Sequence, residues 1–230
     1  MVREKSIVAI ETSEVLATYR ERIAKAFQEV FGDEPWNERW YCEACGASYG
    51  SVRPPADLTC CDTQLVAFYT DDDALRIVDD AYAKPGAAML VATDEQDEVI
   101  AFYWCRVESS HEIEPRLQAA VAACCGGNLP RRYIMSSEAG VLRMHRGQKL
   151  SQRLFLKGIA SVCKIDADVE AVLNKTNPQS PMYYLRLRVG FAEIFREEDT
   201  GDVYMLLAPA ALSKLLEVGS EPYGALERGI

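Results

Sequence analysis

The sequence lacks any run of about 18 consecutive apolar residues, the length that a membrane-spanning helix needs. Its first residues, MVREKSIVAIETSE, turn acidic before the apolar core of a signal peptide could form. We therefore expect a cytoplasmic protein that has no membrane partner.

Basic residues are also scarce. The chain has 25 Lys and Arg against 35 Asp and Glu, which gives a formal net charge of −10. This charge repels a nucleic-acid backbone, so we expect no nucleic-acid partner and a weak preference for cationic partners.

Disulfides are not needed here, because 230 residues with 49% hydrophobic content can bury a sizeable core. Of the eight cysteines, four lie in apolar stretches and are expected to be buried, inert thiols: Cys105, Cys124, Cys125 and Cys163. The other four cluster between residues 42 and 61.

Apolar periodicity predicts alternating strands and helices. We expect strands at 5–11, 131–142, 167–175, 190–195 and 202–208, a hairpin at 87–107 that turns at 94–97, and helices at 13–32, 70–86, within 109–130, from 150 onward and at 177–188. The strands at 131–142 and 167–175 are joined by a helical crossover and should be parallel neighbours.

This order predicts an α/β (α+β) fold with a mixed central sheet of about six to seven strands, flanked by helices. We divide the chain into a first strand and helix (1–35), a Cys-rich insert between the first two helices (36–66), and the remainder of the domain (67–230).

The stretch VLRMHRGQKLSQRLF, Val141 to Phe155, suggests an anion site. If a strand ends at Val141 and a helix contains Leu150, the first N–H groups of that helix have no intrahelical acceptor and carry the positive end of its dipole. Gly147 would let the backbone approach a diphosphate, and Arg146 and Lys149 would add charge. An exposed, capped turn is the alternative.

Two segments together resemble the GNAT superfamily of N-acetyltransferases. Its acetyl-CoA motif is similar to VLRMHRGQKLS, with Val141, Arg146 and Gly147 in place, and its later Asn-to-Tyr motif is similar to Asn177–Tyr184 followed by Gly190-Phe191. The resemblance spans most of residues 5–208.

The resemblance implies that acetyl-CoA is the co-substrate and that a primary amine, either a small molecule or a protein, attacks it directly in a ternary complex. The CoA-binding residues would be Gly140, Val141, Arg146, Gly147, Gln148, Lys149, Leu150, Ser151 and Asn177.

Four residues would take part in the chemistry: Glu138, Tyr184 and two of the CoA-binding positions, Gly140 and Val141. Glu138 would remove the proton from the attacking ammonium, although a salt-bridged glutamate is the other interpretation. The backbone N–H groups near Gly140 and Val141 would stabilise the oxyanion. Tyr184 would protonate the CoA thiolate, unless it is a packing residue of its helix.

The sequence departs from the family pattern at three points: Lys149 stands where the family usually has glycine, Ser151 stands where it has Gly or Ala, and the spacing from Tyr184 to Gly190 is longer. These departures keep an alternative open: a catalytically degenerate protein that binds CoA or acts in regulation, with the insert binding a partner. A homodimer is among the assemblies that the sequence allows.

The insert contains CEACG, fourteen intervening residues after Cys45, and then the pair Cys60-Cys61. Cys42 and Cys45 have the spacing of a zinc knuckle, and we predict that all four thiols hold a structural Zn²⁺. Adjacent residues of a strand point to opposite faces, so both Cys60 and Cys61 can bind one ion only if the backbone turns there. Otherwise Asp62 or water would complete the site.

Disulfides are the less favoured interpretation of these cysteines. We also hypothesise that the zinc module, with Trp36, Trp40 and Tyr41, shapes the acceptor pocket or a protein contact. A protein or nucleic-acid adaptor centred on the insert is the remaining alternative, and the acidic surroundings argue against nucleic acid.

Overall fold

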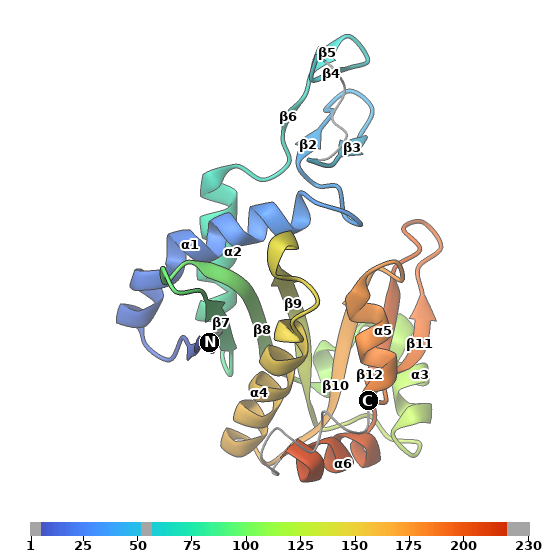
Figure 1. The fold of residues 1–230 in the computed structure, drawn as a ribbon. Helices are drawn as coiled ribbons and strands as arrows, with labels where there is room; N and C mark the ends of the chain where they lie inside the picture. The colour runs from blue at the N-terminus through green and yellow to red at the C-terminus, as the bar shows by residue number, and fades with distance from the viewer. Residues whose placement is uncertain (1–5, 52–56, 220–230) are drawn as a thin grey trace. The chain divides into compact units, whose positions relative to one another are not determined.

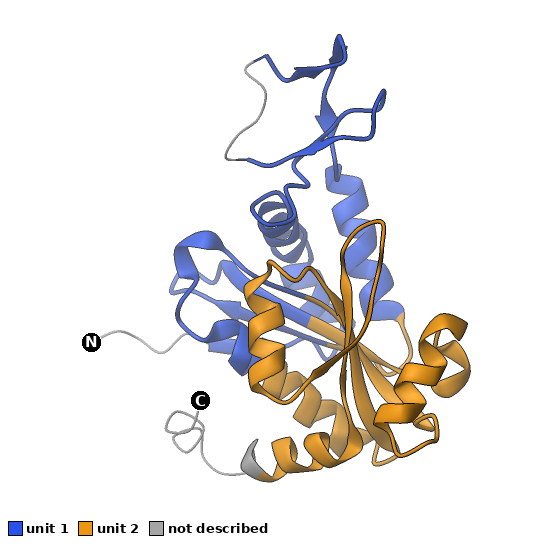
Figure 2. Ribbon diagram, turned by 90° about the vertical axis from the view of Figure 1, so that its right-hand side faces the viewer, with its two compact units in different colours: residues 1–83, 89–103, 139–154 blue, residues 84–88, 104–138, 155–230 orange. Residues whose placement is uncertain are grey.

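The computed structural model describes residues 6–51 and 57–219. Residues 1–5, 52–56 and 220–230 lie outside the described part of the chain. They belong to the predicted segments 1–35, 36–66 and 67–230, respectively. The described residues divide into two compact units, which Figure 2 shows in different colours. Unit 1 comprises residues 1–83, 89–103 and 139–154, and unit 2 comprises residues 84–88, 104–138 and 155–230.

A central sheet of seven strands runs in the order β1-β7-β8-β9-β10-β12-β11 and has helices around it (Figure 1). Its strands are β1 (Ser6–Ala9), β7 (Ala88–Thr93), β8 (Val99–Ser109), β9 (Arg132–Val141), β10 (Val169–Thr176), β11 (Ala192–Arg196) and β12 (Val203–Leu207). The helices are α1 (Ser13–Phe31), α2 (Asp71–Ala83), α3 (Pro115–Cys124), α4 (Leu150–Ile165), α5 (Pro181–Arg188) and α6 (Pro209–Gly219). The predicted fold class is confirmed.

Helix α1 follows its sequence signals closely. The Thr12 hydroxyl accepts a hydrogen bond from the Val15 N–H at 3.3 Å, and the helix ends at Gly32. Its apolar stripe is buried, with Phe27 packed against Phe31 and Phe102. A hydrophobic face at helical spacing therefore fixes α1 within unit 1.

Strands β9 and β10 are parallel neighbours, as predicted. Their register pairs Ile134 with Val172 and ends at the pair Ser136 and Asn174. Beyond that pair, β9 continues to Val141 and β10 to Thr176, while β10 stays paired with β12 through Thr176. The pairing between the two parallel strands therefore ends at Ser136 and Asn174, before either strand ends.

In unit 2, the two faces of β10 contact different helices. Leu173 belongs to a buried cluster with Leu117 and Val121 of α3. Asn174, the next residue, accepts a hydrogen bond from Arg186 of α5 at 3.5 Å. Because successive side chains of a strand point to opposite faces, α3 and α5 lie on opposite sides of this part of the sheet.

Three expectations from the sequence differ from the structure. The insert lacks apolar periodicity, which predicts an irregular segment, but it contains short strands: β2 (Trp40–Tyr41), β3 (Ser48–Tyr49) and β6 (Val66–Ala67) form a small sheet, and β4 (Thr59–Cys60) pairs with β5 (Thr63–Gln64). Helix α6 was not predicted. Cys124 is exposed, because it ends α3 at the turn before two glycines, so its prediction as a buried thiol was wrong.

Cys105 is buried, as expected, while Cys125 and Cys163 are half-buried. No helix within residues 6–51 and 57–219 has the length and apolar character that crossing a membrane requires.

Candidate functional site

The four cysteines of the insert converge in unit 1. The Sγ atoms of Cys42, Cys45, Cys60 and Cys61 all lie within 4.8 Å of one another. The Cys60 Sγ is 3.7 Å from the Sγ of Cys45 and 3.7 Å from that of Cys61. A tetrahedron with Zn–S bonds of about 2.3 Å has edges of about 3.8 Å, so these separations fit one zinc ion.

A backbone turn lets the adjacent thiols face the same point. Cys61 has φ of 50° and Asp62 has φ of 58°, both in the left-handed region. This conformation reverses the chain between β4 and β5, so the Cys60 and Cys61 side chains do not alternate as they would along a strand. The condition that the sequence left open, a turn at this position, is met.

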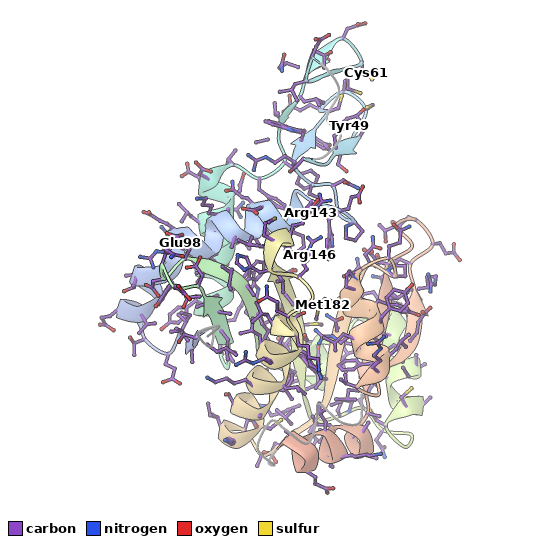
Figure 3. All side chains as sticks on the ribbon, viewed as in Figure 1. Tyr49, Cys61, Glu98, Arg143, Arg146 and Met182 are labelled. Atoms are coloured by element: carbon purple, nitrogen blue, oxygen red, sulfur yellow. The ribbon has the colours of Figure 1, made fainter. Side chains whose placement is uncertain are left out.

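Hydrogen bonds polarise the thiols. The backbone N–H of Ala47 lowers the pKa of Cys45 to about 7, with smaller contributions from the neighbouring thiols. The Tyr49 hydroxyl donates to the Cys60 Sγ at 3.1 Å (Tyr49 and Cys61 are labelled in Figure 3). A metal that needs thiolate ligands therefore meets two sulfur atoms, those of Cys45 and Cys60, that already have hydrogen-bond donors, whereas the neighbouring thiols raise the pKa of Cys61 to about 12.

The turn before α4 presents backbone donors. Among the described residues, none accepts a hydrogen bond from the backbone N–H groups of residues 147 to 152. The first intrahelical bond here runs from the Arg153 N–H to the Lys149 carbonyl at 3.0 Å. Gly147 has φ of 80° and Lys149 has φ of 56°, and residues 147 to 149 are exposed. Such a nest of N–H groups at a helix N-terminus suits an anion.

Lys149 adopts the left-handed conformation although it is not glycine. The Cβ atom makes this conformation unfavourable by about 1–2 kcal/mol. The lysine therefore keeps the backbone shape that a glycine would take and adds a cationic side chain.

Arg146 is held by two partners within unit 1. Its Nε donates to the Val141 carbonyl at 3.2 Å, and its guanidinium lies 3.2 Å from Asp33. Arg143 lies 3.6 Å from the same carboxylate, which is buried. Figure 3 labels both arginines on the segment after β9. Asp33 was not a candidate from sequence, because no local pattern connects it to residue 146.

Gly140 has a packing role. A Cβ at this position would lie 2.5 Å from the Phe102 ring and 2.8 Å from Val30. Only glycine therefore fits between α1 and β8 at this point of β9, a sufficient reason for the residue that is independent of any ligand.

The remaining candidates belong to unit 2. Glu138 is half-buried on β9. The Asn177 side-chain oxygen accepts from the Gln179 N–H at 2.8 Å, which shapes the turn before α5. Tyr184 is 57% exposed on α5, and its ring contacts Tyr183 edge to face at 5.4 Å. Its exposure argues against a role limited to core packing.

Arg186 was missed by the sequence analysis. It is 1% exposed, its guanidinium lies 4.0 Å from the centre of the Phe155 ring, and it donates to the Ser136 hydroxyl at 2.8 Å. These contacts fix α5, and with it Tyr184, to the sheet. A charged residue in an amphipathic helix gives no local sign of such burial.

The fold is similar to that of solved acetyltransferases, one of which is described as a member of the GNAT family. The PaiA N-acetyltransferase from Thermoplasma acidophilum, solved in complex with coenzyme A, is 11% identical, with a TM-score of 0.50 over 88% of this chain and 99% of that one. A candidate GNAT acetyltransferase from Desulfovibrio desulfuricans is 10% identical, with a TM-score of 0.51 over 89% and 99%. A candidate acetyltransferase from Acinetobacter baylyi ADP1 is 9% identical, with a TM-score of 0.54 over 90% and 94%.

At these identities the likeness concerns the fold alone. No protein-family model matches the sequence, and no curated protein matches it.

Proposed function

We propose that this protein is an acetyl-CoA-dependent N-acetyltransferase. The observation that carries the proposal is the run of backbone N–H groups at residues 147 to 152, which have no acceptor among the described residues, at the start of α4 in a GNAT fold. A diphosphate supplies the oxygen acceptors that these donors need.

The charges around this turn fit the same ligand. Lys149 is exposed beside the N–H groups and can approach a phosphate. In this proposal Arg146, which Asp33 and the Val141 carbonyl orient, supports the turn and offers its remaining donors. Gln148, Leu150 and Ser151 contribute backbone donors, and Asn177 would contact CoA through its amide.

The chemistry requires the removal of protons from the acceptor nitrogen and the protonation of the CoA thiolate. An alkylammonium acceptor has a pKa of about 10.4 and must lose a proton before its nitrogen attacks the thioester carbonyl. Glu138 is proposed to take this proton directly or through water. The C–N bond then forms and the C–S bond breaks, and Tyr184 gives a proton to the departing thiolate. The nitrogen loses its second proton to solvent, and a proton from solvent restores Tyr184. Backbone N–H groups near Gly140 and Val141 would stabilise the oxyanion.

The acceptor is proposed to be a primary amine. The net charge of −10 favours the encounter with a cationic molecule, although it does not select one. The end of the β9–β10 pairing at Ser136 and Asn174 is compatible with a pantetheine arm that takes up the strand hydrogen-bonding groups beyond it.

We further propose that the four cysteines bind a structural Zn²⁺. The separations between their sulfur atoms fit a tetrahedral site, and four protein ligands leave no open position for catalysis. In this proposal the ion stabilises the insert, which has only short strands of its own.

Two measurements on the full chain test the enzyme proposal. Equilibrium titration should show CoA binding, and a thiol-release assay with acetyl-CoA and a panel of primary amines should show turnover. Glu138→Gln should lower kcat by about 100-fold or more without changing the Kd for CoA. Glu95→Gln, which removes an exposed carboxylate, is the matched control.

The outcomes separate the alternatives. CoA binding without thiol release for any amine would favour the catalytically degenerate, regulatory protein, whose support is Lys149 at a family glycine position and the longer spacing from Tyr184 to Gly190. Absence of CoA binding would contradict both the enzyme and a CoA-binding alternative, and would leave only a regulatory protein without CoA.

A further inference from the structure

Unit 2 contains a charged cavity that the proposed acetyl transfer does not use. Its volume is about 620 Å³, within the range of small-molecule sites. We call it the β8 pocket, after the strand that supplies half of its lining. All lining residues belong to unit 2, and the charged ones are Lys84, Arg106, Glu108, Glu112 and Arg132.

Two of the charges neutralise each other within the wall. The Arg106 guanidinium donates to one oxygen of Glu108 at 2.5 Å, and the Tyr133 hydroxyl donates to the other at 2.5 Å. Arg106 also donates to Ser137 at 2.9 Å. Glu108 is buried, so this group forms a fixed polar wall and has little capacity to bind an ion.

A third charge is also paired. Arg132 forms an ion pair with Asp166 at 3.0 Å, with half of its side chain exposed. Its electrostatic attraction for an anion is therefore reduced but not abolished.

Lys84 and Glu112 have the greatest capacity to bind a ligand. Lys84 is exposed, and among the described residues no carboxylate lies within ion-pair distance of its ammonium. Glu112 uses one oxygen, Oε2, to accept from the N–H and hydroxyl of Ser109 at 2.7 and 3.0 Å. Its Oε1 accepts no hydrogen bond from any described residue.

The β8 pocket thus offers the ammonium of Lys84 and the Oε1 of Glu112 to a ligand. A ligand with only one sign of charge gains from one of these groups and is repelled by the other. A ligand with both signs gains from both. We propose that the β8 pocket binds a small zwitterion, a molecule with an amino and a carboxylate group, whose carboxylate contacts Lys84 and whose ammonium contacts Glu112.

Matched probes test the charge pattern. The full chain is titrated by calorimetry with 4-aminobutyrate, butylamine and butyrate, and with the shorter 3-aminopropanoate and the longer 6-aminohexanoate. We expect one amino acid of the series to bind at least about five-fold more tightly than butylamine and butyrate, because it makes two charge contacts where they make one.

Variants place the binding in the pocket. Lys84→Gln and Glu112→Gln should each raise the Kd of the best-binding amino acid by about five-fold. Lys164→Gln and Glu95→Gln, at exposed positions outside the pocket, should leave this Kd unchanged. In Glu112→Gln the side-chain oxygen can still accept a hydrogen bond from Ser109. Equal midpoint temperatures of thermal unfolding for variant and parent would show that the fold is retained.

The proposal is overturned if either single-charge probe binds as tightly as the best amino acid and this binding is weakened by Lys84→Gln or Glu112→Gln, which distinguishes the pocket from an amine acceptor site. It is also overturned if both pocket variants bind like the parent, or if no amino acid of the series binds. None of these results depends on CoA binding, so the proposed acetyl transfer can fail or hold independently.

Discussion

Glu197 provides a test of the electrostatics that hold unit 2 together. Its buried carboxylate accepts from Lys175 of β10 at 2.7 Å, from Arg116 of α3 at 2.7 Å and from the Thr200 hydroxyl at 2.9 Å. The hydrogen bond from Lys175 is the largest of the effects that lower the pKa of Glu197 to about 2, and burial opposes them. The carboxylate thus connects the β11–β12 turn to β10 and to α3.

The size of this stabilisation follows from the linkage between folding and the protonation of Glu197. A carboxyl whose pKa is lowered from 4.5 to about 2 contributes at most about 3 kcal/mol, since each pKa unit is worth about 1.4 kcal/mol. Because the folded-state pKa is the lower one, this stability is fully present above the unfolded-state pKa and is lost as the pH falls toward 2. At pH 3 about 1 kcal/mol remains.

Urea unfolding of the parent and of Glu197→Gln at pH 7 and pH 3 measures this effect. The variant should be less stable at pH 7, and the difference in the free energy of unfolding should shrink by about 2 kcal/mol at pH 3. Glu198→Gln, which removes the exposed neighbouring carboxylate, should show no such change. A Glu197→Gln difference of equal size at both pH values would refute the reasoning.

Three further variants probe the other sites. Tyr49→Phe removes the donor to Cys60 and should weaken zinc retention by about 10-fold or more in a chelator competition, and unchanged retention would contradict the assigned contact. Lys149→Gly relieves a positive φ and should raise the free energy of unfolding by about 1 kcal/mol, while titration with CoA should show a weaker affinity. A variant that is less stable than the parent and also binds CoA more weakly would contradict this explanation. Gly140→Ala brings a Cβ to within 2.5 Å of Phe102 and should destabilise by about 1–3 kcal/mol in urea unfolding, so a neutral result would contradict the packing role.

The fold could be predicted because local signals and global pattern agree. Thr12 and Gly32 bound a helix with a regular apolar stripe, and the polar turn at residues 94–97 joins two strands. The crossover through α4 makes β9 and β10 parallel neighbours. Each of these follows from spacing that is visible in one stretch of sequence.

The details of the sites depend on features that spacing does not reveal. Cys61 and Lys149 both adopt positive φ without being glycine, so no turn residue marked either conformation in advance. Asp33 meets Arg146 across a long sequence separation. The burial of Arg186 likewise results from tertiary packing against Phe155 and not from its own helix.

A ¹H–¹⁵N NMR titration of the full chain with CoA would test the central claim most directly. The account predicts that CoA binds and that the backbone amide resonances of residues 147 to 152 show the largest changes, since these N–H groups would acquire phosphate acceptors. Saturable binding that leaves these amides unchanged, or no binding at millimolar CoA, would contradict it.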